Sequence, residues 1–278
     1  ITLPNLACPA YTSLMHTLAI VDGHNFLFKS YAVPFKFYSQ RGTALHVATT
    51  FLSLLRRTAT TVQADSLIVV FDSQEANPNN ILSDSYKANR KQDFSQDEDS
   101  PFFHLPLIKS AMDRLGISWL EKPGIEADDV IASLADKFIN TSPKNKVFIA
   151  SSDSDFFQLI SNKVKIVQLK SKGNHLILDK GYIVSTFGVE PADYIELKSL
   201  VGDKADNIKG IPGIGWKRGL EIMIGKRKRP LGVKEHQLLE LNRQLIRLNR
   251  ELEVGCPISS VSHLIEKSNK DIFEVIDA

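Results

Sequence analysis

Short apolar runs alternate along this chain with longer segments in which apolar residues recur at helical spacing. The short runs are bounded by polar or turn-forming residues and predict buried strands at residues 18–21, 67–71, 147–150 and 164–169. A repeat of three to four residues predicts helices over residues 44–58, 106–115, 127–138 and 156–159. Strands that alternate with helices are typical of a mostly parallel sheet with helices on both faces, so we predict an α/β fold.

The pattern changes after about residue 190, where helices and glycine turns predominate. Residues 238–252 repeat leucine or isoleucine with arginines between them, which predicts an amphipathic helix. Residues 77–106 are polar and predict a long excursion that contains at least one helix. We therefore expect an extension over residues 1–14, an α/β domain over 15–190 and a helical region over 191–278. Met15, which directly precedes the first strand, is the expected natural start.

Composition excludes several classes of protein. Hydrophobic residues make up 43% of the chain and charged residues 24%, as in proteins with a sizeable core. No apolar run reaches the roughly 18 residues that span a bilayer, and the first residues lack the features of a signal peptide. Cys8 and Cys256 lie far apart and fit a reducing compartment. We therefore predict a cytoplasmic protein without membrane contacts.

Aspartates follow three of the predicted strands. Asp22 ends the first strand, Asp72 the second, and Asp153 and Asp155 come after the third. One such aspartate usually forms a turn or caps a helix. In α/β sheets, however, ligands bind beyond the carboxyl ends of the strands, and acids at three strand ends favour a common site.

Two further acidic clusters follow in the chain. Glu126 and Asp129 are three residues apart with Asp128 beside them, and Asp203 and Asp206 have the same spacing. Acids at a helix start also favour the helix dipole, worth roughly 0.3–1 kcal/mol, but this accounts for one cluster only. Together the segments predict a carboxylate metal site.

The ligand types indicate which metal such a site would hold. Carboxylates packed together repel one another unless a cation neutralises them, and oxygen ligands select Mg²⁺ or Mn²⁺ over zinc. The sequence contains no HExxH or CxxC motif. Two ions about 3.5–4 Å apart can activate a water and stabilise the leaving oxygen of a phosphodiester. We therefore predict two Mg²⁺ or Mn²⁺ ions.

Two segments are suited to binding phosphate. Lys87 and Arg90 are three residues apart on a predicted helix; they form either a solvated face or a phosphate grip. Residues 210–219 (GIPGIGWKRG) form a glycine hairpin before a helix, so backbone N–H groups and the side chains of Lys217 and Arg218 can approach a phosphate. The basic run at residues 226–229 is either a solvated segment or a contact with a duplex backbone.

The chain carries, in order, VDGHN, VVFD, YKANR, GIEADDVIASLA, SSDSDFFQLI and GDKADNIKGIPGIGWKRG. Together these motifs resemble the 5′-nuclease family, which includes the flap endonucleases and the 5′-nuclease domain of bacterial DNA polymerase I. The likeness runs from about residue 18 to residue 252. It implies a PIN-like 5′-nuclease fold with a helical arch near residues 79–106 and, because no polymerase segment follows, a stand-alone enzyme of bacterial or phage type.

The resemblance also implies roles for individual residues. The family's metal-site acids match Asp22, Asp72, Glu126, Asp128, Asp129, Asp153, Asp155, Asp203 and Asp206. The arch-side residues that contact the scissile phosphate and the end base match Tyr86, Lys87 and Arg90. The helix–three-turn–helix that binds duplex DNA, often with K⁺ at its loop carbonyls, matches the segment of Gly210, Gly213, Gly215, Lys217 and Arg218. Lys198 lies where a basic residue near the DNA is expected.

The predicted function is that of a monomeric 5′→3′ exonuclease and flap endonuclease acting on DNA with 5′ flaps or 5′ ends. One departure from the family is the stretch NPNNILSDS, which lacks an arginine that many members carry before YKANR. The acidic run QDEDS in the expected arch is another, although such runs are often mobile solvated loops. These departures keep open a DNA-binding protein with weak or no catalysis. A small-molecule phosphohydrolase would leave the glycine hairpin without a role.

Overall fold

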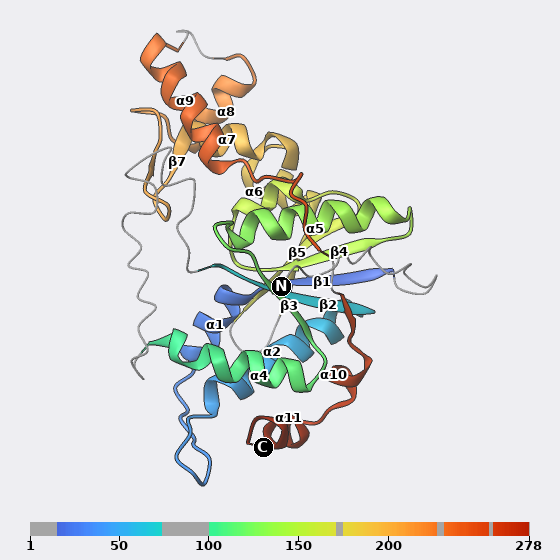
Figure 1. Cartoon of the computed structure of the whole chain (residues 1–278). Helices are drawn as coiled ribbons and strands as arrows, with labels where there is room; N and C mark the ends of the chain where they lie inside the picture. The colour runs from blue at the N-terminus through green and yellow to red at the C-terminus, as the bar shows by residue number, and fades with distance from the viewer. Residues whose placement is uncertain (1–15, 74–99, 171–174, 227–230, 256–257, 278) are drawn as a thin grey trace.

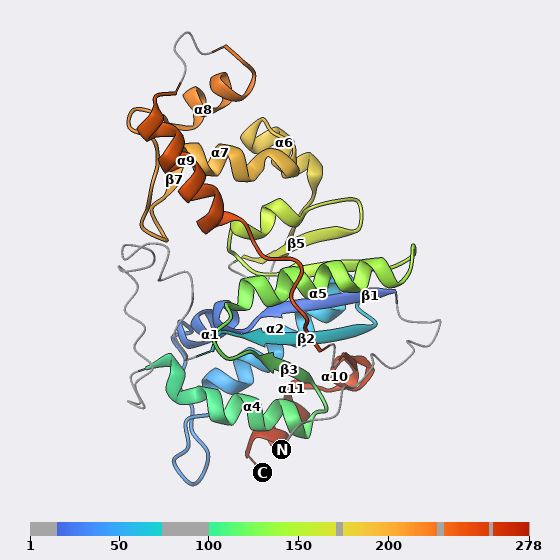
Figure 2. The same cartoon turned by 45° about the horizontal axis from the view of Figure 1, so that its top comes forward.

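A central sheet with helices on both faces forms the body of the molecule, and a helical region extends from one end (Figures 1 and 2). The structure is a computed structural model that describes residues 16–73, 100–170, 175–226, 231–255 and 258–277. The sheet has the order β3-β2-β1-β4-β5-β6, and β9 pairs with part of β2. β1 to β5 are parallel, whereas β6 and β9 are antiparallel to their neighbours. The prediction of a mostly parallel sheet between helices is confirmed.

The strands of this sheet are β1 (Thr17–Asp22), β2 (Ser66–Phe71), β3 (Ser118–Glu121), β4 (Lys146–Ala150), β5 (Val164–Leu169), β6 (His175–Leu178) and β9 (Ser259–Ser260). The predicted strands correspond to β1, β2, β4 and β5. The other strands were missed because they lie at the margins of the sheet, where half-exposed or polar residues weaken the apolar signal.

Side chains of the central strands alternate between two apolar layers. In β1, Ala19 and Val21 join the layer shared with α1 (Gly23–Tyr31), α2 (His46–Val62) and α4 (Leu105–Arg114). Leu18 and Ile20 join the opposite layer with α5 (Ala127–Thr141). All four of these side chains are fully buried. Burial on both faces is the reason why the strand reads as a continuous apolar run rather than as an alternating pattern.

The helical region packs on the α5 side of the sheet, above it in Figure 1. Its elements are α6 (Lys180–Phe187), η4 (Pro191–Asp193), α7 (Tyr194–Val201), β7 (Gly202–Asp203), β8 (Ile208–Lys209), α8 (Trp216–Met223) and α9 (Val233–Ile246). β7 and β8 pair as a short antiparallel hairpin. None of the helices in the described ranges is long and apolar enough to cross a membrane.

Two of the predicted helices differ from the observed elements. Residues 156–159 belong to the 3₁₀ helix η2 (Asp155–Leu159) and not to an α-helix. The helix predicted over residues 238–252 ends at Ile246, where Arg247 adopts an extended conformation. Residues 247–254, which we call the strap, instead run along α5 with Leu248 buried in the core. Tertiary hydrogen bonds and burial therefore override the helical pattern after Ile246.

The end of the chain returns to the opposite face of the sheet. β9 pairs with Ser66 and Leu67 of β2, and α10 (Ser262–Glu266) and α11 (Asn269–Asp277) pack against α2. Ile272 and Ile276 of α11 are buried in the layer that contains α1, α2 and α4. The segment predicted as one helical region, 191–278, therefore divides into a helical part up to α9 and a tail that completes the α/β body.

Candidate metal centre

Acidic side chains meet at the carboxyl edge of the parallel strands. Asp22 is the last residue of β1, Asp72 follows β2, and Asp153 lies in the loop after β4, and these three strands are neighbours in the sheet. The turn from β1 into α1 needs a glycine, because a Cβ on Gly23 would lie 2.4 Å from the ring of Phe71. This close packing starts α1 directly after the strand and leaves Asp22 at the sheet edge.

Asp22 is buried and held in place by hydrogen bonds. Its carboxylate accepts from the backbone N–H of Asn25 at 3.0 Å and from the hydroxyl of Ser151 at 2.7 Å. Burial raises the pKa of Asp22 to about 6 against these hydrogen bonds, and repulsion from Asp72 and Asp153 adds to the rise. Three carboxylates from three strand ends therefore share one electrostatic environment.

Asp72 is oriented by contacts on both carboxylate oxygens. Oδ1 accepts a hydrogen bond from the backbone N–H of Ala127 at 2.8 Å, and Oδ2 lies 2.9 Å from Nδ1 of His24. Ala127 is the first residue of α5, and Glu126 is its N-cap residue. Asp72 therefore holds the start of α5 against the end of β2 and places Glu126 at the same edge of the sheet.

A second group of acids brings η2 together with the loop after α7. Ligand oxygens of Asp155, Asp203 and Asp206 all lie within 4.8 Å of one another, which is close enough for one ion to contact all three. Lys198 of α7 pairs with Asp155, and its Nζ lies 2.6 Å from Asp203. Its side chain is only 4% exposed. A buried ammonium therefore already lies among these carboxylates.

Burial and neighbouring charges shift the pKa values of Asp155, Lys198 and Asp203 in opposite directions. Burial raises the pKa of Asp155 to about 7, outweighing the attraction of Lys198, and repulsion from Asp153 and Asp206 contributes to the rise. Burial opposes the charge of Lys198, yet Asp155 and Asp203 together raise its pKa. Burial acts to raise the pKa of Asp203 as well, but the pairing with Lys198 outweighs it and the pKa is lowered. One lysine does not compensate all of the acids.

These acids fit a divalent cation. All of the converging ligands are oxygens, which hard ions such as Mg²⁺ and Mn²⁺ prefer. The raised pKa values of Asp22 and Asp155 reflect buried negative charge that a cation would stabilise. Asp153 lies close enough to affect both of these pKa values, so it joins the strand-end acids to the second group. Among the described residues, one group of acids (Asp155, Asp203 and Asp206) is close enough to share an ion, and a second ion stays a prediction.

Other acids predicted as ligands lie in the first turn of α5. Asp128 and Asp129 are both half-buried. Asp129 accepts a hydrogen bond at 2.8 Å from the backbone N–H of Asn249 in the strap. This contact gives Asp129 a structural role that its sequence position did not indicate. For both Asp128 and Asp129 the role of metal ligand stays a prediction.

Among the residues predicted to contact DNA, the structure describes Lys198 but not those of the arch side. Tyr86, Lys87 and Arg90 lie outside the described residues, so their roles stay predictions. The ammonium of Lys198 is buried against Asp155 and Asp203, and the predicted place of this residue near the DNA stays a prediction. Its position in the family motif indicated a basic residue near the site but not that its partners are carboxylates.

The glycine hairpin leads into α8 as predicted, but its glycines differ in role. A Cβ on Gly210 would lie 1.9 Å from the carbonyl oxygen of Val201, so this glycine permits close backbone packing rather than an approach to a ligand. Gly213 has a left-handed φ of +76°. Gly215, the N-cap residue of α8, has open space around it.

The charged side chains of the hairpin are exposed. Arg218 donates to the carbonyl of Gly213 at 2.7 Å and so closes the turn. Lys217 is also exposed. An open helix start with two exposed cations beside it is consistent with a phosphate-binding role, which stays a prediction.

Sequence reasoning missed three residues beside the acids. Ser151 links two of them, because its hydroxyl donates to Asp22 and accepts from the backbone N–H of Asp153 at 3.0 Å. His24 contacts Asp72 as described, and Lys29 of α1 donates to Ser152. Burial lowers the pKa of Lys29 against the attraction of Asp22. His24 and Lys29 follow the first acid in VDGHNFLFK, and this proximity was the available signal.

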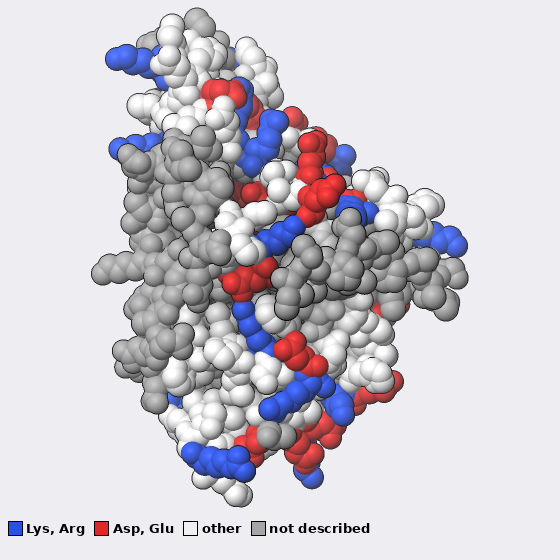
Figure 3. Space-filling model, viewed as in Figure 1, with Lys and Arg blue, Asp and Glu red and all other residues white. Residues whose placement is uncertain are grey.

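The face of the molecule seen in Figure 3 carries acidic and basic side chains interspersed over the helical region and the sheet domain. Among the described residues on this face, acids and bases do not separate into large areas of one sign. The acidic character of the centre arises from the convergence of strand ends and loops rather than from the overall net charge of +2.

The α/β fold and its carboxylate centre define an enzyme of the nuclease class with a PIN-like architecture. Residues 17–188 match the family described as 5'-3' exonuclease, N-terminal resolvase-like domain. A 5'-3' exonuclease of Aquifex aeolicus is 32% identical over 254 residues, which cover 86% of this chain and 84% of that protein. The chain therefore belongs to the 5'-3' exonuclease family.

Other relatives extend this comparison. A 5'-3' exonuclease of Buchnera aphidicola is 31% identical over 210 residues, covering 74% of this chain and 69% of that protein. A thermostable DNA polymerase I of Thermus thermophilus is 31% identical over 204 residues, covering 73% of this chain but only 23% of the polymerase. The bacteriophage T5 D15 protein, crystallised with metal ions, superposes with a TM-score of 0.65 at 24% identity, covering 94% of this chain and 100% of that one. At this identity the likeness concerns the fold.

Proposed function

We propose that this chain is a monomeric 5′→3′ exonuclease and flap endonuclease that hydrolyses DNA phosphodiesters to products with 5′-phosphate and 3′-hydroxyl ends. The observation that carries the proposal is the convergence of Asp155, Asp203 and Asp206 within 4.8 Å in a member of the 5'-3' exonuclease family. The flap specificity is supported by one fold neighbour, a T5 D15 flap endonuclease whose structure contains DNA and metal ions.

Two Mg²⁺ or Mn²⁺ ions are proposed at the carboxylates. Asp22, Asp72 and Asp153 would hold one ion, with Glu126 and Asp128 beside them, and Asp155, Asp203 and Asp206 the other. Divalent ions at such sites supply a Lewis acid for the phosphate oxygens and lower the pKa of a water. The protein's contribution is to hold the acids in place through Ser151, His24 and the start of α5.

The remaining contacts with DNA are proposed from the chain's own groups. Tyr86, Lys87 and Arg90 are assigned to the scissile phosphate and the terminal base. The hairpin of residues 210–219 is assigned to the duplex backbone, with K⁺ as an additional ligand of its carbonyl oxygens. Exposed Lys217 and the open start of α8 support this assignment, because backbone N–H groups at a helix start favour phosphate.

Cleavage of a 5′-labelled flap DNA tests the proposal. We expect cutting near the junction with Mg²⁺ or Mn²⁺, and none with EDTA. Asp153→Asn should lower the rate at least about 100-fold, equivalent to about 2.7 kcal/mol, while DNA binding in Ca²⁺ stays unchanged. The matched control is Asp193→Asn, an exposed acid of η4, which should cut at the wild-type rate.

Either of two results would refute the proposal. Normal cutting by Asp153→Asn would show that the carboxylates are not the catalytic centre. Binding of flap DNA without cutting in both metals would instead support a structure-specific DNA-binding protein.

A further inference from the structure

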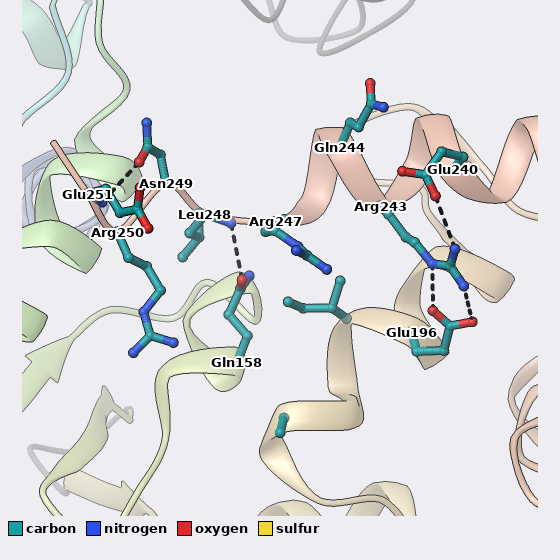
Figure 4. Close-up of a pocket in the computed structure, with 12 residues that line it drawn as sticks. Gln158, Glu196, Glu240, Arg243, Gln244, Arg247, Leu248, Asn249, Arg250 and Glu251 are labelled. Atoms are coloured by element: carbon teal, nitrogen blue, oxygen red, sulfur yellow. Dashed lines mark hydrogen bonds and ion pairs between the residues drawn. The ribbon is translucent and has the colours of Figure 1, made fainter.

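The amide side chain of Gln158 joins η2, the short helix that begins at Asp155, to the end of α9. Its Nε2 donates to the backbone carbonyl of Asp155 at 2.8 Å and to that of Ile246 at 3.0 Å. Its Oε1 accepts from the backbone N–H of Leu248 at 3.1 Å, as Figure 4 shows. The residue is 8% exposed. On one side the amide bonds the backbone of Asp155. On the other side it bonds the last carbonyl of α9, that of Ile246, and the N–H of Leu248 in the strap.

A second amide, that of Asn242 on α9, holds the loop after α7 that carries Asp203 and Asp206. Asn242 lies one turn before the end of α9 and is 1% exposed. Its Nδ2 donates at 2.9 Å to the backbone carbonyls of Ser199 and Lys209. These two carbonyls lie on either side of the loop that carries Asp203 and Asp206. The last turns of α9 therefore contact both segments that carry the second group of acids, η2 and the loop after α7.

The strap continues this connection along α5. Ser133 donates to the carbonyl of Asn249 at 3.1 Å and accepts from the N–H of Leu252 at 3.1 Å. Arg250 forms two contacts of 2.6 Å with Asp136. With the bond from Asn249 to Asp129, these contacts fix the strap on the helix whose first turn carries predicted metal-site acids. The end of α9 is therefore anchored and can serve as a fixed support.

We propose that Gln158 is a positioning residue that sets the distance between Asp155 and the acids of the loop after α7, by tying η2 to the end of α9. The inference rests on the proposed function, in which these acids hold a divalent ion. A ligand oxygen that shifts by a few tenths of an ångström weakens metal binding, and groups that orient ligands typically change metal affinity about 10–100-fold when mutated. No other described side chain bonds both η2 and the strap.

Gln158 lies beside a groove that water can enter, which limits the cost of replacing it. It lines a groove of about 1040 Å³ together with Glu196, Arg243 and the strap residues Arg247 to Glu251. In Figure 4, Gln158 reaches from its helix toward the strap, while Gln244 of α9 lies elsewhere on the rim. Water can enter an open groove and satisfy the backbone groups that the amide releases. Gln244, exposed and lining the same groove, offers a matched control.

The test measures metal binding and local opening in the absence of DNA. Gln158→Met keeps the length of the side chain and loses all three hydrogen bonds, whereas Gln158→Glu keeps the acceptor for Leu248 and loses the donors. In calorimetric titrations with Mn²⁺ alone, we expect Gln158→Met to raise the Kd at least about 10-fold, with Gln158→Glu between it and wild type. Gln244→Met should match wild type.

Hydrogen exchange in EDTA reports positioning without metal. In Gln158→Met, amides of residues 155–160 and 246–250 should exchange faster, while those of β1 stay protected as in wild type. A folded Gln158→Met that binds Mn²⁺ within about twofold of wild type overturns the inference. If this variant does not fold, wild-type affinity in Gln158→Glu overturns it instead.

The inference and the proposed function fail in different ways. Wild-type protein that binds Mn²⁺ but cuts no flap DNA refutes the nuclease proposal. In that case the affinity ratio between wild type and Gln158→Met still decides whether Gln158 positions the acids. Wild-type protein that binds no Mn²⁺ overturns the positioning role directly, because there is then no metal affinity to set.

Discussion

Replacing Lys198 with methionine removes a buried positive charge that compensates two acids, Asp155 and Asp203, in the metal-free protein. The lysine side chain is 4% exposed and contacts both Asp155 and Asp203. Methionine retains a similar apolar volume, so the change isolates the loss of the ammonium group. Removing one partner of a buried ion pair leaves an uncompensated charge and typically costs about 3–5 kcal/mol. We expect a loss of unfolding free energy in this range near neutral pH.

The dependence of this loss on pH follows from Asp155. Burial raises its pKa from 3.8 to about 7 even with Lys198 present, so the pKa must rise further in Lys198→Met. At pH values between the unfolded and folded pKa of Asp155, the folded protein binds about one more proton than the unfolded chain. The free energy of unfolding therefore falls as the pH rises, by about 1.4 kcal/mol per pH unit. In wild type this decline ends near pH 7, whereas in the variant it continues. From pH 7 to about pH 8.5 the variant should lose roughly 2 kcal/mol more than wild type.

Urea denaturation in EDTA at about pH 6, 7 and 8.5 measures the effect. The control is Lys180→Met, since Lys180 forms an exposed pair with Glu190 at 2.9 Å and should contribute less than about 1 kcal/mol at every pH. If Lys198→Met and wild type have parallel stability curves within about 0.5 kcal/mol, Lys198 does not compensate buried charge and the reasoning is refuted.

Three other predictions concern the metal centre and its supports. In thermal denaturation, Mn²⁺ at about 100 times its Kd for wild type should stabilise the wild-type protein by about 2.7 kcal/mol. At the same Mn²⁺ concentration Asp155→Asn should lose most of this stabilisation, and an equal stabilisation would exclude Asp155 as a ligand. Gly210→Ala should destabilise by at least about 1–3 kcal/mol through backbone overlap, while Gly215→Ala, with open space around it, should change urea stability by less than about 0.5 kcal/mol. Arg243 forms two hydrogen bonds of 2.7 Å with Glu196, and both side chains are about one-third exposed. Arg243→Met should lower the free energy of unfolding by about 1 kcal/mol without slowing DNA cleavage. A slower cleavage rate would show that this pair also supports the site.

The sequence identified the central strands and most of the long helices because their burial is expressed in local patterns. β1 and β2 read as apolar runs since both faces of each strand are covered. The helices over residues 46–62 and 127–141 read from their apolar spacing. The edge strand β6 was not predicted, because Leu176 and Ile177 are partly exposed and give no pattern of a buried strand.

The candidate site was predicted in composition but not in geometry. Acids at strand ends had to converge once the sheet was parallel, because parallel strands place their carboxyl ends at the same edge. The local pattern did not show that Lys198 is buried among the acids or that Asp129 holds the strap. Both contacts join residues more than 40 positions apart in the chain, and no spacing rule reports such pairs.

What the sequence by itself determined is the set of local choices: which segments are strands, where acids follow them, and where glycines permit a turn. What only the tertiary structure decided is how far each helix extends and what each charged side chain contacts. Residues 247–252 have a helical pattern, yet their backbone N–H groups donate to Gln158 and to Ser133 of α5, and the segment is an extended strap. The physical reason is that helix propensity differs by only a few tenths of a kcal/mol per residue, whereas burial and tertiary hydrogen bonds contribute about 1 kcal/mol or more each.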